Sequence, residues 1–178
     1  MVDNCSTIVE LLQHRASSQS QKTAFTFLED GETETATITY IELDRRAKAI
    51  ATQLQALNLS GERALLLYPS GLDYLAAFLG CLYAGVIAVP AYPPQNQRKT
   101  PRIQAIVADA QPAIALTTET LLPRMESLLG KIGDLQWLAT DNLEAGIEAN
   151  WQKPDLEKDA IAFLQYTSGS TGTPKGVM

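Results

Sequence analysis

Cysteine and histidine are scarce in this sequence. Its 178 residues include two cysteines, Cys5 and Cys81, and one histidine, His14. Two thiols far apart in the chain give neither a disulfide framework nor a cysteine-rich metal site, and one histidine excludes a histidine-cluster site. Cys81 lies in the apolar run LAAFLGCLYAG, which favours a buried free thiol. We therefore expect no resident metal, and we expect His14 to be a surface helix residue.

Positively charged residues are also fewer than negatively charged ones. The chain has 14 Lys and Arg residues against 20 Asp and Glu residues, a formal net charge of -6. Such a surface disfavours general binding to nucleic acid, although a local loop can still hold a nucleotide phosphate. No apolar run reaches the roughly 18 residues that cross a bilayer. The N-terminus also lacks the basic start of a secretory signal, so we predict a cytoplasmic protein without a membrane span.

The first third of the chain has local signals for a helix, a hairpin and a second helix. Thr7 and Glu10 have capping-box spacing and predict a helix near residues 7–17. Two β-like runs, at 24–28 and 33–40, flank an Asp-Gly pair, which predicts a hairpin. Thr39 and Glu42 repeat the capping-box spacing and predict a helix near 40–57.

Strands and helices alternate in the rest of the chain. Continuous apolar runs without polar alternation are typical of strands buried on both faces of a parallel sheet. The strands are predicted at 64–68, 86–90, 113–117, 135–140 and 161–166, and the helices at 72–84, 101–110 and 119–129. The predicted fold is α/β: a parallel sheet with helices on both faces, preceded by a helix and a β-hairpin.

The most informative segment is YTSGSTGTPKG at residues 166–176. Glycines let backbone amides turn toward an anion, hydroxyls donate to phosphate oxygens, and Lys175 adds a positive charge. The segment follows a predicted buried strand, and open α/β sheets bind ligands beyond the carboxyl ends of their strands. The predicted ATP-phosphate-binding residues are Thr167, Ser168, Gly169, Ser170, Thr171, Gly172, Thr173, Lys175 and Gly176.

Two familiar phosphate motifs do not fit this segment. A P-loop requires glycine directly before the lysine, where this chain has Pro174, and the glycine spacing does not match a dinucleotide fingerprint. A mobile Ser/Gly/Thr linker is the alternative. It is disfavoured because a linker need not follow a buried strand directly or end in Pro-Lys-Gly.

Residues 166–176 resemble the signature phosphate loop of adenylate-forming enzymes, [YF]-T-S-G-[ST]-T-G-x-P-K-G. The runs TYIEL at 39–43 and GVIAVP at 85–90 resemble two further motifs of that superfamily. Within it, AVPAYPP at 88–94, RIQAIVAD at 102–109, ALTT at 115–118 and Gln165 are similar to fatty acyl-AMP ligases, including polyketide synthase loading domains. The likeness spans about residues 6–178.

The resemblance implies an ATP-dependent reaction in which a fatty carboxylate gives acyl-adenylate and pyrophosphate with help from Mg²⁺. The acyl group then passes to an acyl carrier protein, which can be part of the same polypeptide. Residues 1–178 would be the N-terminal part of the large adenylation domain, cut off after the phosphate loop. The family's adenine, ribose and Mg²⁺ residues and its catalytic lysine would lie downstream, so no catalytic residue is assigned and this portion alone is expected to be inactive.

Other readings of the sequence stay open. A long-chain acyl-CoA synthetase would use the same loop, and a noncatalytic nucleotide-binding or assembly module is a third possibility. Arg98, Lys99 and Arg102 form a small basic cluster that could meet an acidic carrier protein, although a solvated loop and helix start is favoured. Tyr92 could line an acyl tunnel or pack beside Pro93. None of these is assigned to a site.

Overall fold

A four-stranded parallel sheet forms the centre of the molecule. The computed structural model describes residues 5–129, 135–156, 159–168 and 174–178. The sheet has the order β4-β3-β5-β6, and all its neighbouring pairs are parallel. Its strands are β3 (Arg63–Leu67), β4 (Ile87–Ala91), β5 (Ile114–Thr117) and β6 (Gln136–Ala139). The predicted α/β fold with a parallel sheet is confirmed.

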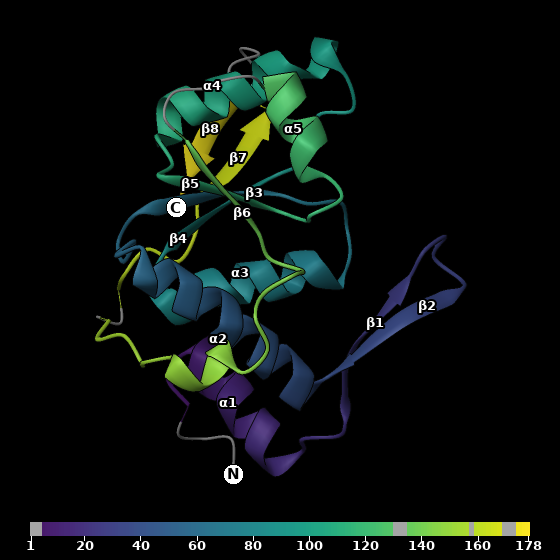
Figure 1. Cartoon of the computed structure of the whole chain (residues 1–178), viewed down its shortest axis with the longest axis vertical. Helices are drawn as coiled ribbons and strands as arrows, with labels where there is room; N and C mark the ends of the chain where they lie inside the picture. The colour runs from purple at the N-terminus through teal and green to yellow at the C-terminus, as the bar shows by residue number, and fades with distance from the viewer. Residues whose placement is uncertain (1–4, 130–134, 157–158, 169–173) are drawn as a thin grey trace.

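Helices cover both faces of this sheet (Figure 1). They are α1 (Ile8–Ser18), α2 (Tyr40–Ala56), α3 (Leu72–Ala84), α4 (Thr100–Ala110) and α5 (Leu122–Leu129). Side chains alternate between the faces of a strand, so Leu66 of β3 packs in the cluster with α1, α2 and α3. Leu65 and Leu67 point the other way, toward α4 and α5. Both faces are buried, which explains the unbroken apolar strands.

The predicted helix boundaries are confirmed where local capping chemistry defines them. The Thr7 hydroxyl accepts from the Glu10 amide at the start of α1, and Thr39 and Glu42 form a reciprocal capping box at the start of α2. Gly85 follows α3 in the left-handed conformation, with φ of 70°, which suits a residue without a Cβ atom. Cys81 in α3 is a buried free thiol, as predicted, and burial raises its pKa to about 12.

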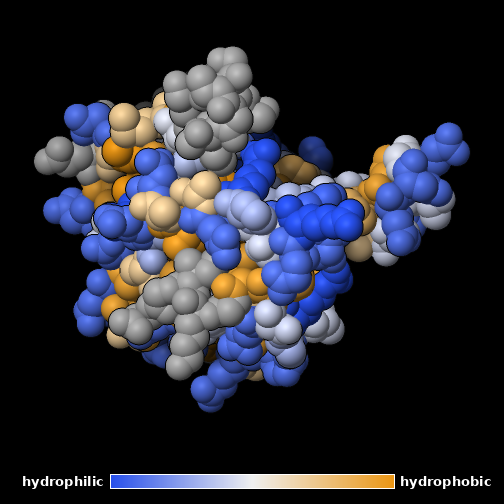
Figure 2. Space-filling view, turned by 90° about the horizontal axis from the view of Figure 1, so that it is seen from above, coloured by the Kyte–Doolittle hydropathy of each residue, from blue (hydrophilic) through white to orange (hydrophobic). Residues whose placement is uncertain are grey.

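The hairpin of β1 (Thr23–Leu28) and β2 (Glu34–Thr39) extends away from the body as an arm (Figure 1). Figure 2 shows that its tip is hydrophilic, with apolar surface nearer the body; Phe25 and Leu28 are exposed. Asp30 organises the turn because its carboxylate accepts from the amides of Thr33 and Glu32. These bonds, led by that from Thr33, lower the pKa of Asp30 to about 2.

The connection between β6 and the last strands crosses the helical layer that contains α2 and α3. It includes the short 3-10 helix η2 (Ile147–Asn150). Trp151 then donates from Nε1 to the Tyr83 carbonyl at 2.9 Å, and Gln152 exchanges hydrogen bonds with the Gln55 side chain. The carboxylate of Glu10 on α1 lies 2.9 Å from the Lys153 ammonium. This part of the chain is thus attached to three helices before it reaches the sheet.

The predicted final strand at 161–166 is partly wrong. Residues 162–164 do lie beside β4, where Leu164 donates its amide to the Ala88 carbonyl at 2.8 Å and Phe163 forms an isolated parallel bridge. However, Ile161 is 44% exposed and Phe163 is 39% exposed, so the first part of the run is not buried. The strand assigned there, β7 (Gln165–Ser168), begins later and pairs with β8 (Pro174–Val177) instead. No helix of the described part of the chain could cross a membrane.

Candidate phosphate-binding hairpin and adjacent pocket

The segment predicted to bind phosphate forms the hairpin β7–β8. The two strands are antiparallel, and Tyr166 pairs with Gly176 while Thr167 pairs with Lys175. The hairpin lies beside α4, on the side of the sheet that carries α4 and α5 (Figure 1). It follows directly after the residues that run along the outer edge of β4. Its position therefore matches the expected place for a ligand-binding segment of an open α/β sheet.

The structure describes only some of the predicted site residues. Thr167 is exposed in β7 and Gly176 is exposed in β8. Ser168 and Lys175 belong to the paired strands, but the description does not extend to their side chains. The remaining predicted residues, Gly169, Ser170, Thr171, Gly172 and Thr173, lie outside the described residues. The assignment of these nine residues to ATP phosphates stays a prediction.

Tyr166, one residue before the predicted site, is a buried residue of the hairpin. It is 4% exposed and packs in the core cluster beneath α4 and α5. Its hydroxyl donates to Oδ2 of Asp109 at 2.6 Å. Burial, followed by the hydrogen bond to the Asp109 carboxylate, raises the pKa of Tyr166 to about 12. The phenol therefore remains a neutral donor across the physiological pH range.

Gly176 has a packing role that the sequence did not reveal. A Cβ atom at this position would lie 3.1 Å from Cζ and 3.2 Å from the hydroxyl oxygen of Tyr166. The glycine thus lets the tyrosine ring lie against β8. The sequence assigned Gly176 to anion binding alone, because the cross-strand pair with Tyr166 cannot be recognised without the register of the hairpin.

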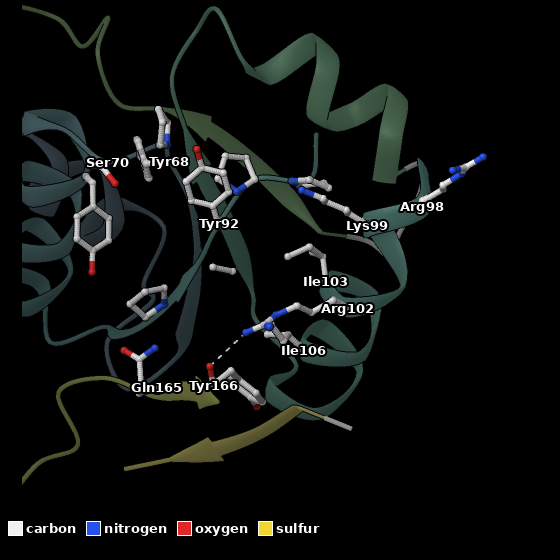
Figure 3. Close-up of a pocket in the computed structure, with 16 residues that line it drawn as sticks. Tyr68, Ser70, Tyr92, Arg98, Lys99, Arg102, Ile103, Ile106, Gln165 and Tyr166 are labelled. Carbon is white, nitrogen blue, oxygen red and sulfur yellow. Dashed lines mark hydrogen bonds between the residues drawn. The ribbon is translucent and has the colours of Figure 1, made fainter. Parts of the chain in front are cut away.

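A pocket of about 750 Å³ opens between the ends of β3 and β4, helix α4 and β7 (Figure 3). Its wall includes four tyrosines and three cations. The lining residues with polar or charged side chains are Tyr68, Ser70, Tyr74, Tyr92, Arg98, Lys99, Arg102, Gln165 and Tyr166. Proline, isoleucine and alanine residues complete the wall. This mixture suits a ligand that has both an anionic group and an apolar part.

The basic cluster predicted from the sequence lies in this wall. Arg98 and Lys99 are in the short helix η1 (Gln97–Lys99), and Arg102 is in the first turn of α4. All three side chains are exposed, in agreement with the favoured solvated reading, but Nη2 of Arg102 also lies 3.4 Å from the Tyr166 carbonyl oxygen (Figure 3). Tyr92 is 62% exposed and lines the same pocket.

The sequence did not predict that these residues line one pocket. Its residues come from segments near 68–74, 90–106 and 165–166, and only the parallel sheet brings these together. The usable signal was the clustering of tyrosine and arginine directly after predicted strands, since those positions meet at one edge of a parallel sheet.

The fold and the hairpin define an α/β protein with a candidate phosphate-binding segment at the edge of its sheet. The chain belongs to the family of AMP-binding enzymes, because the model of that family matches residues 12–178. The resemblance to adenylate-forming enzymes stated from the sequence is therefore confirmed.

Two individual relatives of the chain are named as fatty acid ligases. The chain is 45% identical over 180 residues to the medium-chain-fatty-acid–[acyl-carrier-protein] ligase JamA of Moorena producens, covering 97% of this chain and 30% of that protein. It is 36% identical over 182 residues to the putative fatty-acid–CoA ligase FadD21 of Mycobacterium tuberculosis, covering 97% of this chain and 31% of FadD21.

A solved structure agrees with both the fold and the family. The fatty acyl-adenylate ligase from Legionella pneumophila, in complex with acyl adenylate and pyrophosphate, superposes with a TM-score of 0.87 at 41% identity. The match covers 98% of this chain and 30% of that one. The chain thus spans about a third or less of the length of the relatives it matches.

Proposed function

We propose that the protein to which these residues belong activates a fatty acid with ATP. The carboxylate oxygen of the fatty acid attacks the α-phosphorus, the bond to the bridging oxygen breaks, and pyrophosphate leaves. The thiol of an acyl carrier protein then attacks the acyl carbon of the acyl-adenylate, and AMP leaves. The observation that carries the proposal is the TSGSTGTPKG segment on a hairpin at the sheet edge, in a chain 45% identical to a fatty acid ligase.

The role proposed for this chain is to hold the β- and γ-phosphates of ATP. Hydroxyls and backbone amides between Thr167 and Gly176 would donate to the phosphate oxygens, and Lys175 would add a charge-assisted contact. Such contacts position the triphosphate and stabilise the charge that develops on the leaving pyrophosphate.

Magnesium would act as a partner of the triphosphate. Among the described residues, no group of three His, Cys, Asp or Glu side chains could hold a metal ion. Mg²⁺ is commonly bound through substrate phosphates with one or two carboxylates, so its protein ligands are expected elsewhere in the enzyme. When bound, it would offset negative charge on the phosphates.

Formation of acyl-adenylate tests the proposal directly. The full-length protein, incubated with ATP, Mg²⁺ and a fatty acid, is expected to produce acyl-AMP and pyrophosphate, whereas residues 1–178 alone are expected to produce none. Mass spectrometry of acyl-AMP measures both. Acyl-AMP above background from residues 1–178 would show that these residues alone are sufficient for adenylation. Absence of acyl-AMP from the full-length protein would reject the proposed activity.

Lys175→Ala in the full-length protein is expected to lower kcat/KM for ATP by about 10- to 100-fold, because one charge-assisted hydrogen bond is lost. Pyrophosphate exchange measured at several ATP concentrations gives this ratio. Lys153→Ala is the matched control, since Lys153 pairs with Glu10 on α1 and should leave ATP use unchanged. ATP kinetics that are the same in Lys175→Ala and wild type would contradict the assigned role.

A second candidate is an acyl-CoA synthetase, because FadD21 is named a putative fatty-acid–CoA ligase. Both candidates form the same acyl-adenylate and differ in the thiol acceptor. Parallel assays with CoA and with a carrier protein that bears phosphopantetheine distinguish them. Rapid formation of acyl-CoA would reject the carrier protein as the acceptor.

A further inference from the structure

Hairpin β7–β8 contacts the body of the molecule at α4 and β4. Of its side chains that the structure describes, Tyr166 is buried, whereas Gln165, Thr167, Gly176 and Val177 are exposed. Among the described side chains of the hairpin, the Tyr166 ring thus supplies the buried contact with the core. A two-stranded hairpin on its own is only marginally stable, so its position depends on what holds Tyr166.

Helix α4 makes two hydrogen bonds to Tyr166. Near the end of the helix, the Asp109 carboxylate accepts a hydrogen bond from the Tyr166 hydroxyl at 2.6 Å. In the first turn, Arg102 donates to the Tyr166 backbone carbonyl at the longer distance of 3.4 Å. The ring itself packs in the same cluster as Ile103 and Ile106 of this helix. One residue of β7 is thus fixed at its ring, its hydroxyl and its backbone by one helix.

The Asp109 contact is the strongest polar contact of this set. It is short, and its acceptor is a carboxylate, which makes such bonds about twice as strong as bonds between neutral groups. Asp109 itself is exposed and makes no ion pair among the described residues. Among the described residues, the Tyr166 hydroxyl is therefore the partner that accounts for the position of the Asp109 carboxylate.

We infer that Asp109 is a positioning residue for ATP: through the Tyr166 hydroxyl it holds hairpin β7–β8 on α4 and so fixes the phosphate segment that begins at Thr167. The inference rests on the proposed function of that segment. Asp109 does not touch the nucleotide in this scheme. Its loss lets the hairpin move and weakens ATP binding, while binding of the fatty acid is unchanged.

The test combines kinetics with amide hydrogen exchange in the full-length protein. In Asp109→Ala and in Tyr166→Phe, KM for ATP is expected to rise about tenfold, because each variant loses the same charged hydrogen bond. KM for the fatty acid should stay as in wild type. Amides of residues 165–168 and 175–177 should exchange at least about fivefold faster, whereas those of β3 and β5 should not change.

Three further variants separate positioning from general structure. Asp109→Asn keeps an oxygen that can accept from the Tyr166 hydroxyl, so it should restore most of the ATP affinity. The double variant Asp109→Ala/Tyr166→Phe should resemble either single variant, because both remove one interaction. Tyr40→Phe removes a hydroxyl at the start of α2, where Tyr40 packs against the other core cluster, and should behave as wild type.

The outcomes distinguish the inference from the function on which it rests. A wild-type protein that forms no acyl-AMP would reject the proposed function. If wild type is active but Asp109→Ala and Tyr166→Phe retain its KM for ATP and its hairpin exchange, the positioning role of Asp109 is wrong. Equal rises of KM for ATP and for the fatty acid would also overturn it, since they would indicate a general loss of structure.

Discussion

Replacing Asp44 with alanine is expected to lower the free energy of unfolding by about 3 kcal/mol, because it breaks a buried charged network. Asp44 on α2 is 4% exposed. Its carboxylate accepts from the Tyr83 hydroxyl of α3 at 2.7 Å and lies 2.7 Å from the Lys48 ammonium. Alanine would leave both partners without their acceptor, and an unpaired buried polar group loses its full solvation.

The network extends beyond the two helices. The Lys48 ammonium lies 5.4 Å from the centre of a Trp151 ring, and Trp151 in turn bonds the Tyr83 carbonyl. Burial, together with the Asp44 carboxylate, raises the pKa of Tyr83, so the hydroxyl stays a donor. Asp44 thus joins α2, α3 and the connection that leads to β7, which is why a large effect is expected from one carboxylate.

Urea unfolding of a series of variants measures this effect. Asp44→Asn keeps an acceptor for Tyr83 and should be intermediate, and Tyr83→Phe should cost about 1–2 kcal/mol because only one hydrogen bond is lost. The double variant Asp44→Ala/Tyr83→Phe should be less destabilised than the sum of the two single variants. An Asp44→Ala protein within about 0.5 kcal/mol of wild type, the range of ordinary surface changes, would show that the network contributes little.

Elements whose ends depend on local chemistry could be predicted from the sequence. The capping box of Thr39 and Glu42 defines the start of α2, and Gly85 ends α3 because it is in the left-handed conformation. The continuous apolar runs gave the parallel sheet, since strands covered on both faces have no polar alternation. In these cases the deciding interactions lie within a few residues of each other.

The errors and omissions involve contacts between distant parts of the chain. Ile161 and Phe163 belong to an apolar run whose sequence predicts a buried strand, yet they lie at the sheet edge and remain exposed. The bond between Tyr166 and Asp109 spans 57 residues, and no local pattern indicates it. The pocket wall also combines three separate segments. The composition of the proposed phosphate segment could be read from the sequence, whereas the residues proposed to position it could not.

Replacing Gly80 with valine is expected to destabilise the protein by about 3 kcal/mol, the upper part of the range for overpacked cores. A Cβ atom on Gly80 in α3 would lie 2.7 Å from both Cβ and Cγ2 of Ile50 in α2. Ile50 is itself buried and β-branched, so its Cβ cannot move without a shift of the helix backbone. Valine would therefore force apart α2 and α3 over their contact.

Gly80→Ala decides between this packing argument and helix propensity, because the two predict opposite signs. Propensity alone would make alanine more stable than glycine in a helix interior by about 1 kcal/mol. The contact with Ile50 should outweigh that gain and leave Gly80→Ala less stable than wild type, with Gly80→Val less stable still. Gln104→Val, at an exposed position of α4, is the control for valine in a helix and should change stability by about 0.5 kcal/mol or less. A rise in the urea midpoint of Gly80→Ala would mean that α2 and α3 separate easily, and the close approach of these helices would then not explain the glycine.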